Sequence, residues 1–327
     1  MLSYILRRLL GIVPLFLGIT IISFIVIHLS PGKPTSIEQA LNPRVSLETR
    51  AKLDKIYGLD KPLHVQYVNW FSRLLRFDFD RSFRDGRPVS EKILERMPVT
   101  ITINLISLAL IFLLAIPIGI KCAVNENRTF DKITTVLVFI TFAMPVFWLA
   151  LLLMDLFCIR LGWLPVSGIK SLDFDYLSPL GKFLDMSKHL ILPIFVLSLG
   201  GLAGVSRYMR SSMIDALRQP YINTARAKGL PEDKVIYKHA LRNAILPIVT
   251  IVGLSIPGLL AGSVFFESIF AIPGIGRLFY EAVMMRDYPL IMAEVVLGAV
   301  LTMFGNLIAD ISYAVADPRI RFKGNEK

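Results

Sequence analysis

Apolar residues gather into six long runs, each separated from the next by a more polar segment. The runs are roughly 20 residues or longer, which is the length that a helix needs to cross the ~30 Å hydrocarbon core of a bilayer. Prolines and glycines interrupt several runs, and helices in lipid tolerate them where neighbouring helices satisfy the backbone. The pattern predicts six transmembrane helices, at residues 9–29, 99–120, 133–157, 190–208, 245–266 and 290–313.

The composition agrees with a membrane protein. Hydrophobic residues make up 54% of the chain, and the mean hydropathy is +0.60. A water-soluble protein of this composition would have too little polar surface. The first apolar run is too long for a secretory signal peptide, and Ser30-Pro31-Gly32-Lys33 contains no small-x-small cleavage site. We expect this run to remain as the first span.

The net charge of +11 comes from an excess of Lys and Arg, and these residues are distributed unevenly among the loops. With the N-terminus inside, 17 of these residues lie in cytoplasmic segments and six in the two short outer loops. The other 13 lie in residues 30–98, a segment too long for its charge to control orientation. The bias predicts that both termini are cytoplasmic. It also explains the basic charge without nucleic acid as a partner.

The outer segment, residues 30–98, has helical patterns but few apolar positions. We expect one helix at residues 46–57, a second after Pro62, and a short third one from Val89 to Pro98. The segment is too small and too thinly apolar for an enzyme domain. We therefore expect a helical cap that packs on the spans. The chain then divides into residues 1–29 with the first span, the external insert 30–98, a five-helix core 99–316 and a cytoplasmic tail 317–327.

Within the core, the cytoplasmic loop at residues 209–244 is a series of short amphipathic helices separated by Pro and Gly. Ala225 and Ala227 would leave a low ridge, and Gly229 permits a turn with positive φ. Four basic side chains surround that ridge: Arg226, Lys228, His239 and Arg242. This arrangement suits docking into an acidic groove of a partner protein. The alternative is a basic loop whose side chains snorkel at the lipid surface.

The strings TARAKGL and HALRNAILP in this loop resemble the EAA-type cytoplasmic loop of dipeptide/oligopeptide ABC importer permeases. Further segments resemble the same family, in the same order along the chain: YILRRLL, GLDKPLHVQY, WLPVSG, RSSM, IPGIGRLFYEAVMMRDYP and DPRIR. There is one departure from the general importer pattern. The Glu-Ala-Ala triplet is replaced by Asn223-Thr224-Ala225, and the closing Pro247 stands 18 residues beyond Gly229.

The resemblance implies an all-α permease with the type I ABC importer fold, in a bacterial or archaeal cell (inner) membrane. It implies a pathway for di- or oligopeptides, with nickel complexes, glutathione and oligosaccharides as alternative solutes. Its partners would be a second homologous permease, two ABC ATPase subunits and an extracytoplasmic solute-binding protein. The ATPase contact would be made by part of the loop: Thr224, Ala225, Arg226, Ala227, Gly229, His239 and Arg242.

We expect no catalytic residues and no cofactor in this chain. It lacks the Gly-x-x-x-x-Gly-Lys-Ser/Thr phosphate-binding loop, so ATP and Mg would be bound by the partner ATPases. The four histidines are scattered without metal-ligand spacing. An ion-driven secondary transporter is the less favoured alternative, because we find no inverted repeat. A membrane-embedded enzyme would need a convergent catalytic cluster, and none stands out.

Three carboxyl groups in the predicted spans are candidates for lining the solute pathway: Asp155, Glu294 and Asp310. A carboxylate at the bilayer centre costs roughly 2.5–3.5 kcal/mol on insertion scales, so it should face the bundle interior or a wet cavity. The alternative for Asp155 and Glu294 is an interfacial position where the carboxylate reaches water. For Asp310 the two interpretations are balanced.

Overall fold

The computed structural model describes residues 2–30, 55 and 58–316 of the chain. The secondary structure of these residues is helical, apart from one isolated bridge between Arg81 and Pro88. The prediction of an all-α protein is therefore confirmed. Among the described residues, four helices are long and apolar enough to cross a membrane, and two bent pairs raise the number of candidate spans to as many as six.

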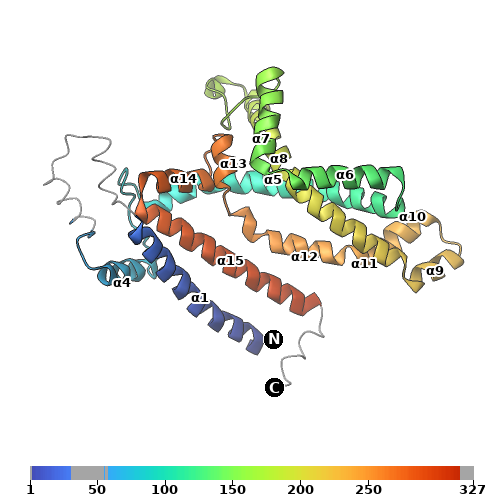
Figure 1. Cartoon of the computed structure of the whole chain (residues 1–327), viewed down its shortest axis with the longest axis horizontal. Helices are drawn as coiled ribbons and strands as arrows, with labels where there is room; N and C mark the ends of the chain where they lie inside the picture. Colours follow the sequence, from blue (N-terminus) through green and yellow to red (C-terminus); the bar gives the residue numbers. More distant parts are fainter. Residues whose placement is uncertain (1, 31–54, 56–57, 317–327) are drawn as a thin grey trace.

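The four long helices contain four of the predicted spans: α1 (Leu2–Leu29), α5 (Val89–Val124), α8 (Pro179–Leu217) and α15 (Tyr288–Ala316). Helices α1 and α15 lie side by side, while α5 packs against α8 (Figure 1). The second contact is close because Gly119 of α5 has no side chain. A Cβ atom there would lie 2.6 Å from Cβ of Met209 and 2.8 Å from the carbonyl oxygen of Ser206.

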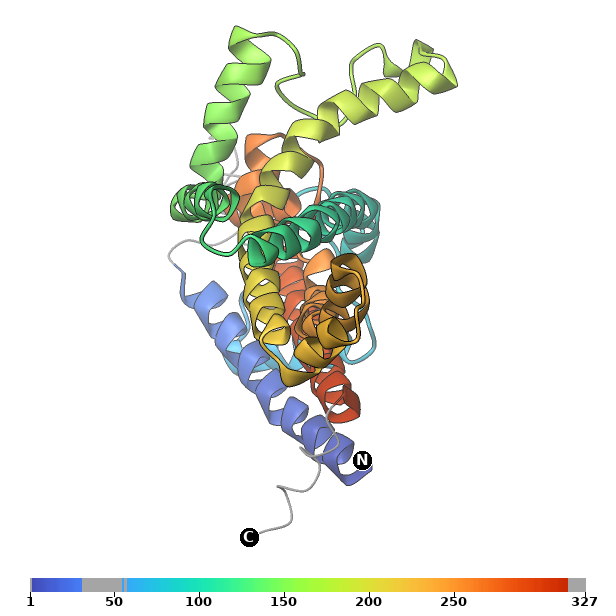
Figure 2. The same ribbon diagram turned by 90° about the vertical axis from the view of Figure 1, so that its right-hand side faces the viewer.

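The predicted third span is broken. It consists of α6 (Thr129–Ala143) and α7 (Val146–Met154), which continues into a π-helix, η1 (Asp155–Arg160), with a bend of 100° between the two parts. The expectation of one helix over residues 133–157 is wrong, because Pro145 disfavours the helical conformation of the residue before it. Met144 is accordingly extended, with φ −83° and ψ 130°. In Figure 2, α7 and the first half of α8 diverge away from the other helices.

The predicted fifth span is also interrupted. Helices α10 (Glu232–Lys234), η3 (Val235–Ala240) and α11 (Leu241–Ala244) lead into α12 (Leu246–Ser255) through a bend of 48°. A 3-10 turn, η4 (Pro257–Leu259), and the separate short helix α13 (Val264–Ile269) follow. The single helix expected over residues 245–266 is therefore wrong. Pro257 has no N–H to donate to a continuing helix.

Shorter helices connect these elements: α4 (Leu63–Leu74), η2 (Phe174–Tyr176), α9 (Pro220–Ala227) and α14 (Ile275–Met285). Helix α4 confirms the helix predicted after Pro62, whereas the helix predicted at residues 46–57 lies outside the described residues. The helix predicted from Val89 continues through Pro98 as part of α5. The Asp287 carboxylate before α15 accepts hydrogen bonds from the Ser82 hydroxyl and the Phe83 N–H, which ties the insert to the core.

Candidate functional site: the coupling segment and the cavity beside α15

The coupling segment (residues 209–244) is organised around α9. This helix begins at Pro220, whose missing N–H is not needed in the first turn. It ends at Ala227. In the turn that follows, Gly229 has φ +75° and donates from its N–H to the carbonyl oxygen of Arg226 at 2.9 Å. The positive φ explains why this position carries glycine. The bounds of the helix and the turn after it are therefore defined by local sequence.

One face of α9 packs into the protein. Ile222 is fully buried and Ala225 is only 6% exposed, in a cluster with Val235, Ile236 and Ala240 of η3. The expectation that Ala225 lies on an exposed ridge is wrong. Ala225 stands three residues after Ile222, so the two share the inward face of the helix.

The opposite face of α9 is open. Thr224, Ala227 and Gly229 are exposed, and an added Cβ at Gly229 would meet no atom within 4 Å. The Thr224 hydroxyl donates to the carbonyl oxygen of Pro220 at 3.2 Å, so it is directed along its own helix. This surface is low and small-featured, and a partner backbone could approach it closely.

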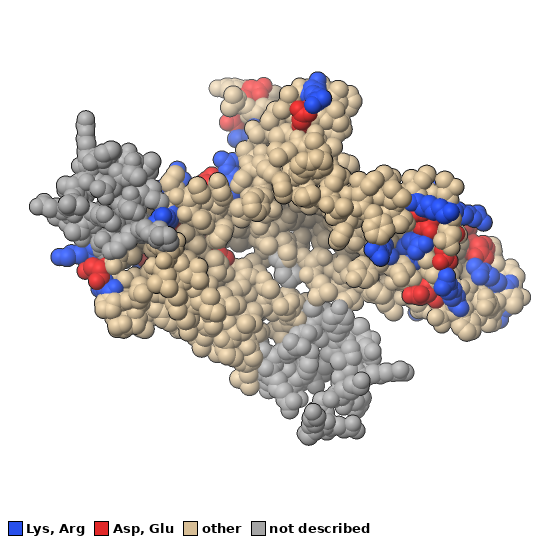
Figure 3. All heavy atoms as spheres, viewed as in Figure 1, with Lys and Arg blue, Asp and Glu red and all other residues tan. Residues whose placement is uncertain are grey.

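The charge around this surface is mixed rather than purely basic. The Arg226 guanidinium pairs with Glu232, with N–O distances of 2.6 and 3.2 Å, and these hydrogen bonds raise the pKa of Arg226. Arg242 is exposed and His239 is half-buried. Figure 3 shows Lys and Arg intermixed with Asp and Glu at this end of the molecule, while the middle of the same face is nearly free of charge.

Two ion pairs join the base of the coupling segment to the turn after α5 and to the first turn of α6. The Asp131 carboxylate is buried and accepts two hydrogen bonds from Arg210, at 2.6 and 2.7 Å, and a third from the Asn127 N–H. Glu126 pairs with Arg218 at 3.0 Å in a more exposed position. Sequence reasoning missed the buried pair because 79 residues separate its members.

The three candidate carboxyl groups have different surroundings. Glu294 is 9% exposed and lines a cavity of about 450 Å³ beside α15. Asp155 is the first residue of η1 and pairs with Arg160 at 2.7 Å. Its side chain is partly exposed and therefore reaches the surface of the chain. Asp310 belongs to α15, but its side chain is outside the described residues. The structure thus brings only Glu294 to the cavity among the described candidates.

A second buried carboxylate shapes the wall of the same cavity. The Glu267 carboxylate accepts hydrogen bonds from the Thr100 hydroxyl at 3.0 Å and from the Arg277 N–H at 2.9 Å. The Thr100 oxygen in turn accepts from the Ile275 N–H at 2.9 Å. These bonds join α5 and α13 to the start of α14, where Ile275 and Gly276 line the cavity. The sequence offered no signal for a contact across 167 residues.

The candidate spans, with an exposed short helix between two of them, describe a multi-pass membrane protein. The chain belongs to the family described as "Binding-protein-dependent transport system inner membrane component", which matches residues 115–322. The N-terminal part of the same class, "Binding-prot-dependent transport system membrane comp, N-term", matches residues 1–104. It is a non-catalytic, multi-pass component of the inner membrane, the permease of a binding-protein-dependent ABC importer.

Curated relatives match over nearly the full length. The chain is 44% identical to the oligopeptide transport system permease protein AppB of Bacillus subtilis, over 98% of this chain and 100% of AppB. It is 39% identical to the glutathione transport system permease protein GsiC of Salmonella typhimurium, and 38% identical to the dipeptide transport system permease protein DppB of Escherichia coli. Each of these two matches covers 99% of this chain and 100% of the relative.

Among solved structures, the chain is similar to one from the MetNI methionine ABC transporter in an inward-facing conformation. The TM-score is 0.49 and the identity 15%, over 67% of this chain and 95% of that one.

Proposed function

We propose that this permease carries di- or oligopeptides and that the exposed face of α9 docks on an ATPase subunit. The peptide assignment is supported by the names of AppB and DppB, and GsiC makes glutathione the second candidate. Nickel complexes and oligosaccharides remain further alternatives. A second permease, two ATPases and an external binding protein would complete the importer, with both termini of this chain in the cytoplasm.

The observation that carries the docking proposal is the shape of the coupling segment. One face of α9 packs against η3 through Ile222 and Ala225. A displacement of α9 would therefore displace η3 and the segment that leads into α12. The other face, with Thr224, Ala227 and Gly229, is exposed in the described part of the chain, where an added Cβ at Gly229 would meet no atom within 4 Å. A rigid helix with one anchored and one open face is suited to transmit movement from a partner.

Replacing Gly229 by Val tests the docking proposal. An added Cβ would meet no described atom within 4 Å, so the main cost to the chain is the backbone strain of φ +75°, about 1–2 kcal/mol. We expect the variant to reach the membrane, to lose peptide uptake in cells that express the whole importer, and to lose solute-stimulated ATPase activity. Gly229→Asn, which tolerates positive φ at lower cost, should show the same loss if bulk at the interface is responsible.

Gly162→Val is the matched control, because Gly162 also has positive φ (+62°) and open space around it but lies in the loop after η1. It should retain uptake. If Gly229→Val and Gly162→Val transport equally well, the docking surface is wrongly assigned. Uptake that persists when ATP is depleted while the ion gradient is held would favour a secondary transporter instead.

A further inference from the structure

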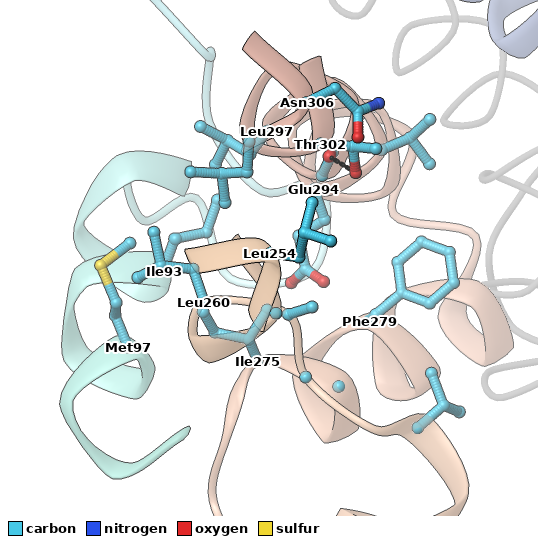
Figure 4. A pocket seen from close by; sticks show the side chains of 18 residues that line it. Ile93, Met97, Leu254, Leu260, Ile275, Phe279, Glu294, Leu297, Thr302 and Asn306 are labelled. Carbon is cyan, nitrogen blue, oxygen red and sulfur yellow. Dashed lines mark hydrogen bonds between the residues drawn. The ribbon is translucent and has the colours of Figure 1, made fainter. Parts of the chain in front are cut away.

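The cavity beside α15 lies where the fifth span is interrupted. Its walls come from α5, the chain around η4, α14 and α15, and most of the lining side chains are apolar. Figure 4 shows the Glu294 carboxylate directed into the space between Leu254, Ile275 and Phe279. At about 450 Å³, the cavity is in the range of small-molecule sites.

The polar lining of this cavity follows one face of α15. Glu294, Thr302 and Asn306 line it together with Gly298, and these four positions stand four residues apart. Such spacing places them on one side of a helix. Gly298, Thr302 and Asn306 are exposed within this chain, so Glu294 lies at the buried end of a polar stripe. A polar stripe in a spanning helix is costly in lipid and is expected to face a wet pathway or another subunit.

Glu294 has no cationic partner in the part of the chain that is described. Its Oε1 atom is buried and forms no hydrogen bond there, and the described lining of the cavity contains no Lys, Arg or His. The neighbouring acid, Glu267, already has its carboxylate bound by Thr100 and a backbone N–H. An unpaired buried carboxylate is strongly unfavourable. The site is therefore complementary to a positively charged hydrogen-bond donor that arrives from outside the chain.

We propose that Glu294 receives the protonated amino terminus of the transported peptide, while the apolar walls accommodate its side chains. The inference rests on the proposed function, because a protonated amino terminus is a cationic hydrogen-bond donor that unmodified peptides share. An ammonium group donates up to three hydrogen bonds, and Glu294 together with the Thr302 and Asn306 oxygens offers acceptors along its path. The site selects for a class of solute, those with a free amino group, rather than for a particular side chain.

Uptake by the complete importer in proteoliposomes tests the proposal. Two solutes are compared, a peptide with a free amino terminus and its N-acetylated form, with wild type, Glu294→Gln and the control Glu91→Gln. Glu91 is an exposed carboxylate on α5 that pairs with Arg87 outside the cavity. For each solute, uptake by the variant is divided by uptake by the wild type. This ratio cancels any preference of the external binding protein for one solute.

We expect Glu294→Gln to lower uptake of the free peptide at least about tenfold, because a charge-assisted hydrogen bond is lost. Uptake of the acetylated peptide and the Glu91→Gln ratios should change less than about twofold. Equal loss for both solutes, or no loss, would overturn the assignment while leaving the importer function standing. Failure of the wild-type importer to carry either peptide would instead contradict the proposed function.

A measurement on the wild-type complex covers the case in which Glu294→Gln does not assemble or the acetylated peptide is not transported. Dicyclohexylcarbodiimide modifies carboxyl groups in apolar surroundings, and mass spectrometry locates the adduct. The free peptide should slow modification of Glu294 at least about threefold, whereas the acetylated peptide should not. If Glu294 is modified at the same rate in the presence of the free peptide as in the presence of the acetylated peptide, no ammonium group is bound there.

Discussion

Replacing Arg210 by Met should destabilise the permease core more than the loss of any exposed ion pair. Arg210 lies on α8 and holds Asp131 at the start of α6 through two hydrogen bonds of 2.6 and 2.7 Å. Methionine keeps most of the apolar stem but removes the charge. Asp131, whose side chain is only 4% exposed, would then remain buried and unpaired apart from the Asn127 N–H.

The magnitude follows from the burial of the two partners. Removing one member of a buried pair typically costs about 3–5 kcal/mol. Because the Arg210 side chain is 29% exposed, water can reach part of the site, and we expect the lower end, about 3 kcal/mol. Asp131→Asn should cost less, about 1–2 kcal/mol, since Arg210 can turn toward water and no buried charge is left. The double variant should be more stable than the sum of the single changes by about 1–2 kcal/mol.

The assay is denaturant unfolding of the purified chain in mixed micelles, with the four members of the double-mutant cycle measured side by side. Arg218→Met provides the control, because the Arg218–Glu126 pair is exposed and should contribute less than about 1 kcal/mol. If Arg210→Met is no more destabilising than Arg218→Met, the buried pair does not stabilise the core as described. Additive effects of the two changes in the cycle would contradict the pairing in the same way.

Two further predictions concern packing around the cavity and between the long helices. Thr100→Val removes the hydroxyl that joins Glu267 to Ile275 and should lower the free energy of unfolding by about 1–3 kcal/mol. Thr100→Ser keeps the hydroxyl and should lower it less. Equal effects of the two changes would show that the hydroxyl is unimportant. Gly119→Val must displace α5 from α8 and should lower the free energy of unfolding by about 1–3 kcal/mol. Gly204→Val, where an added Cβ meets no atom within 4 Å, should leave it unchanged in the same assay. Similar values for both variants would contradict the close helix contact.

The apolar spans and the family were readable from the sequence because both are local properties of the chain. Hydropathy over some 20 residues depends on no distant contact, and α1, α5, α8 and α15 lie where it predicted them. The turn at Gly229 is local too, since only a residue free of Cβ strain adopts φ +75° easily. The motifs of the coupling segment identified an importer permease for the same reason.

The bends and the site depended on tertiary structure. A proline such as Pro145 predicts a break in the helix. The bend angle of 100° depends on the packing of α7 against α8 and α13. Ala225 was expected to face a partner, and its burial is decided by η3, which covers that side of α9. The pairs Asp131–Arg210 and Thr100–Glu267 join residues far apart in the chain. Glu294 was recognisable in the sequence as an unusual acid in a span. Only the folded helices enclose it in a cavity whose described lining contains no Lys, Arg or His, because enclosure is a property of several helices together and of no single stretch of sequence.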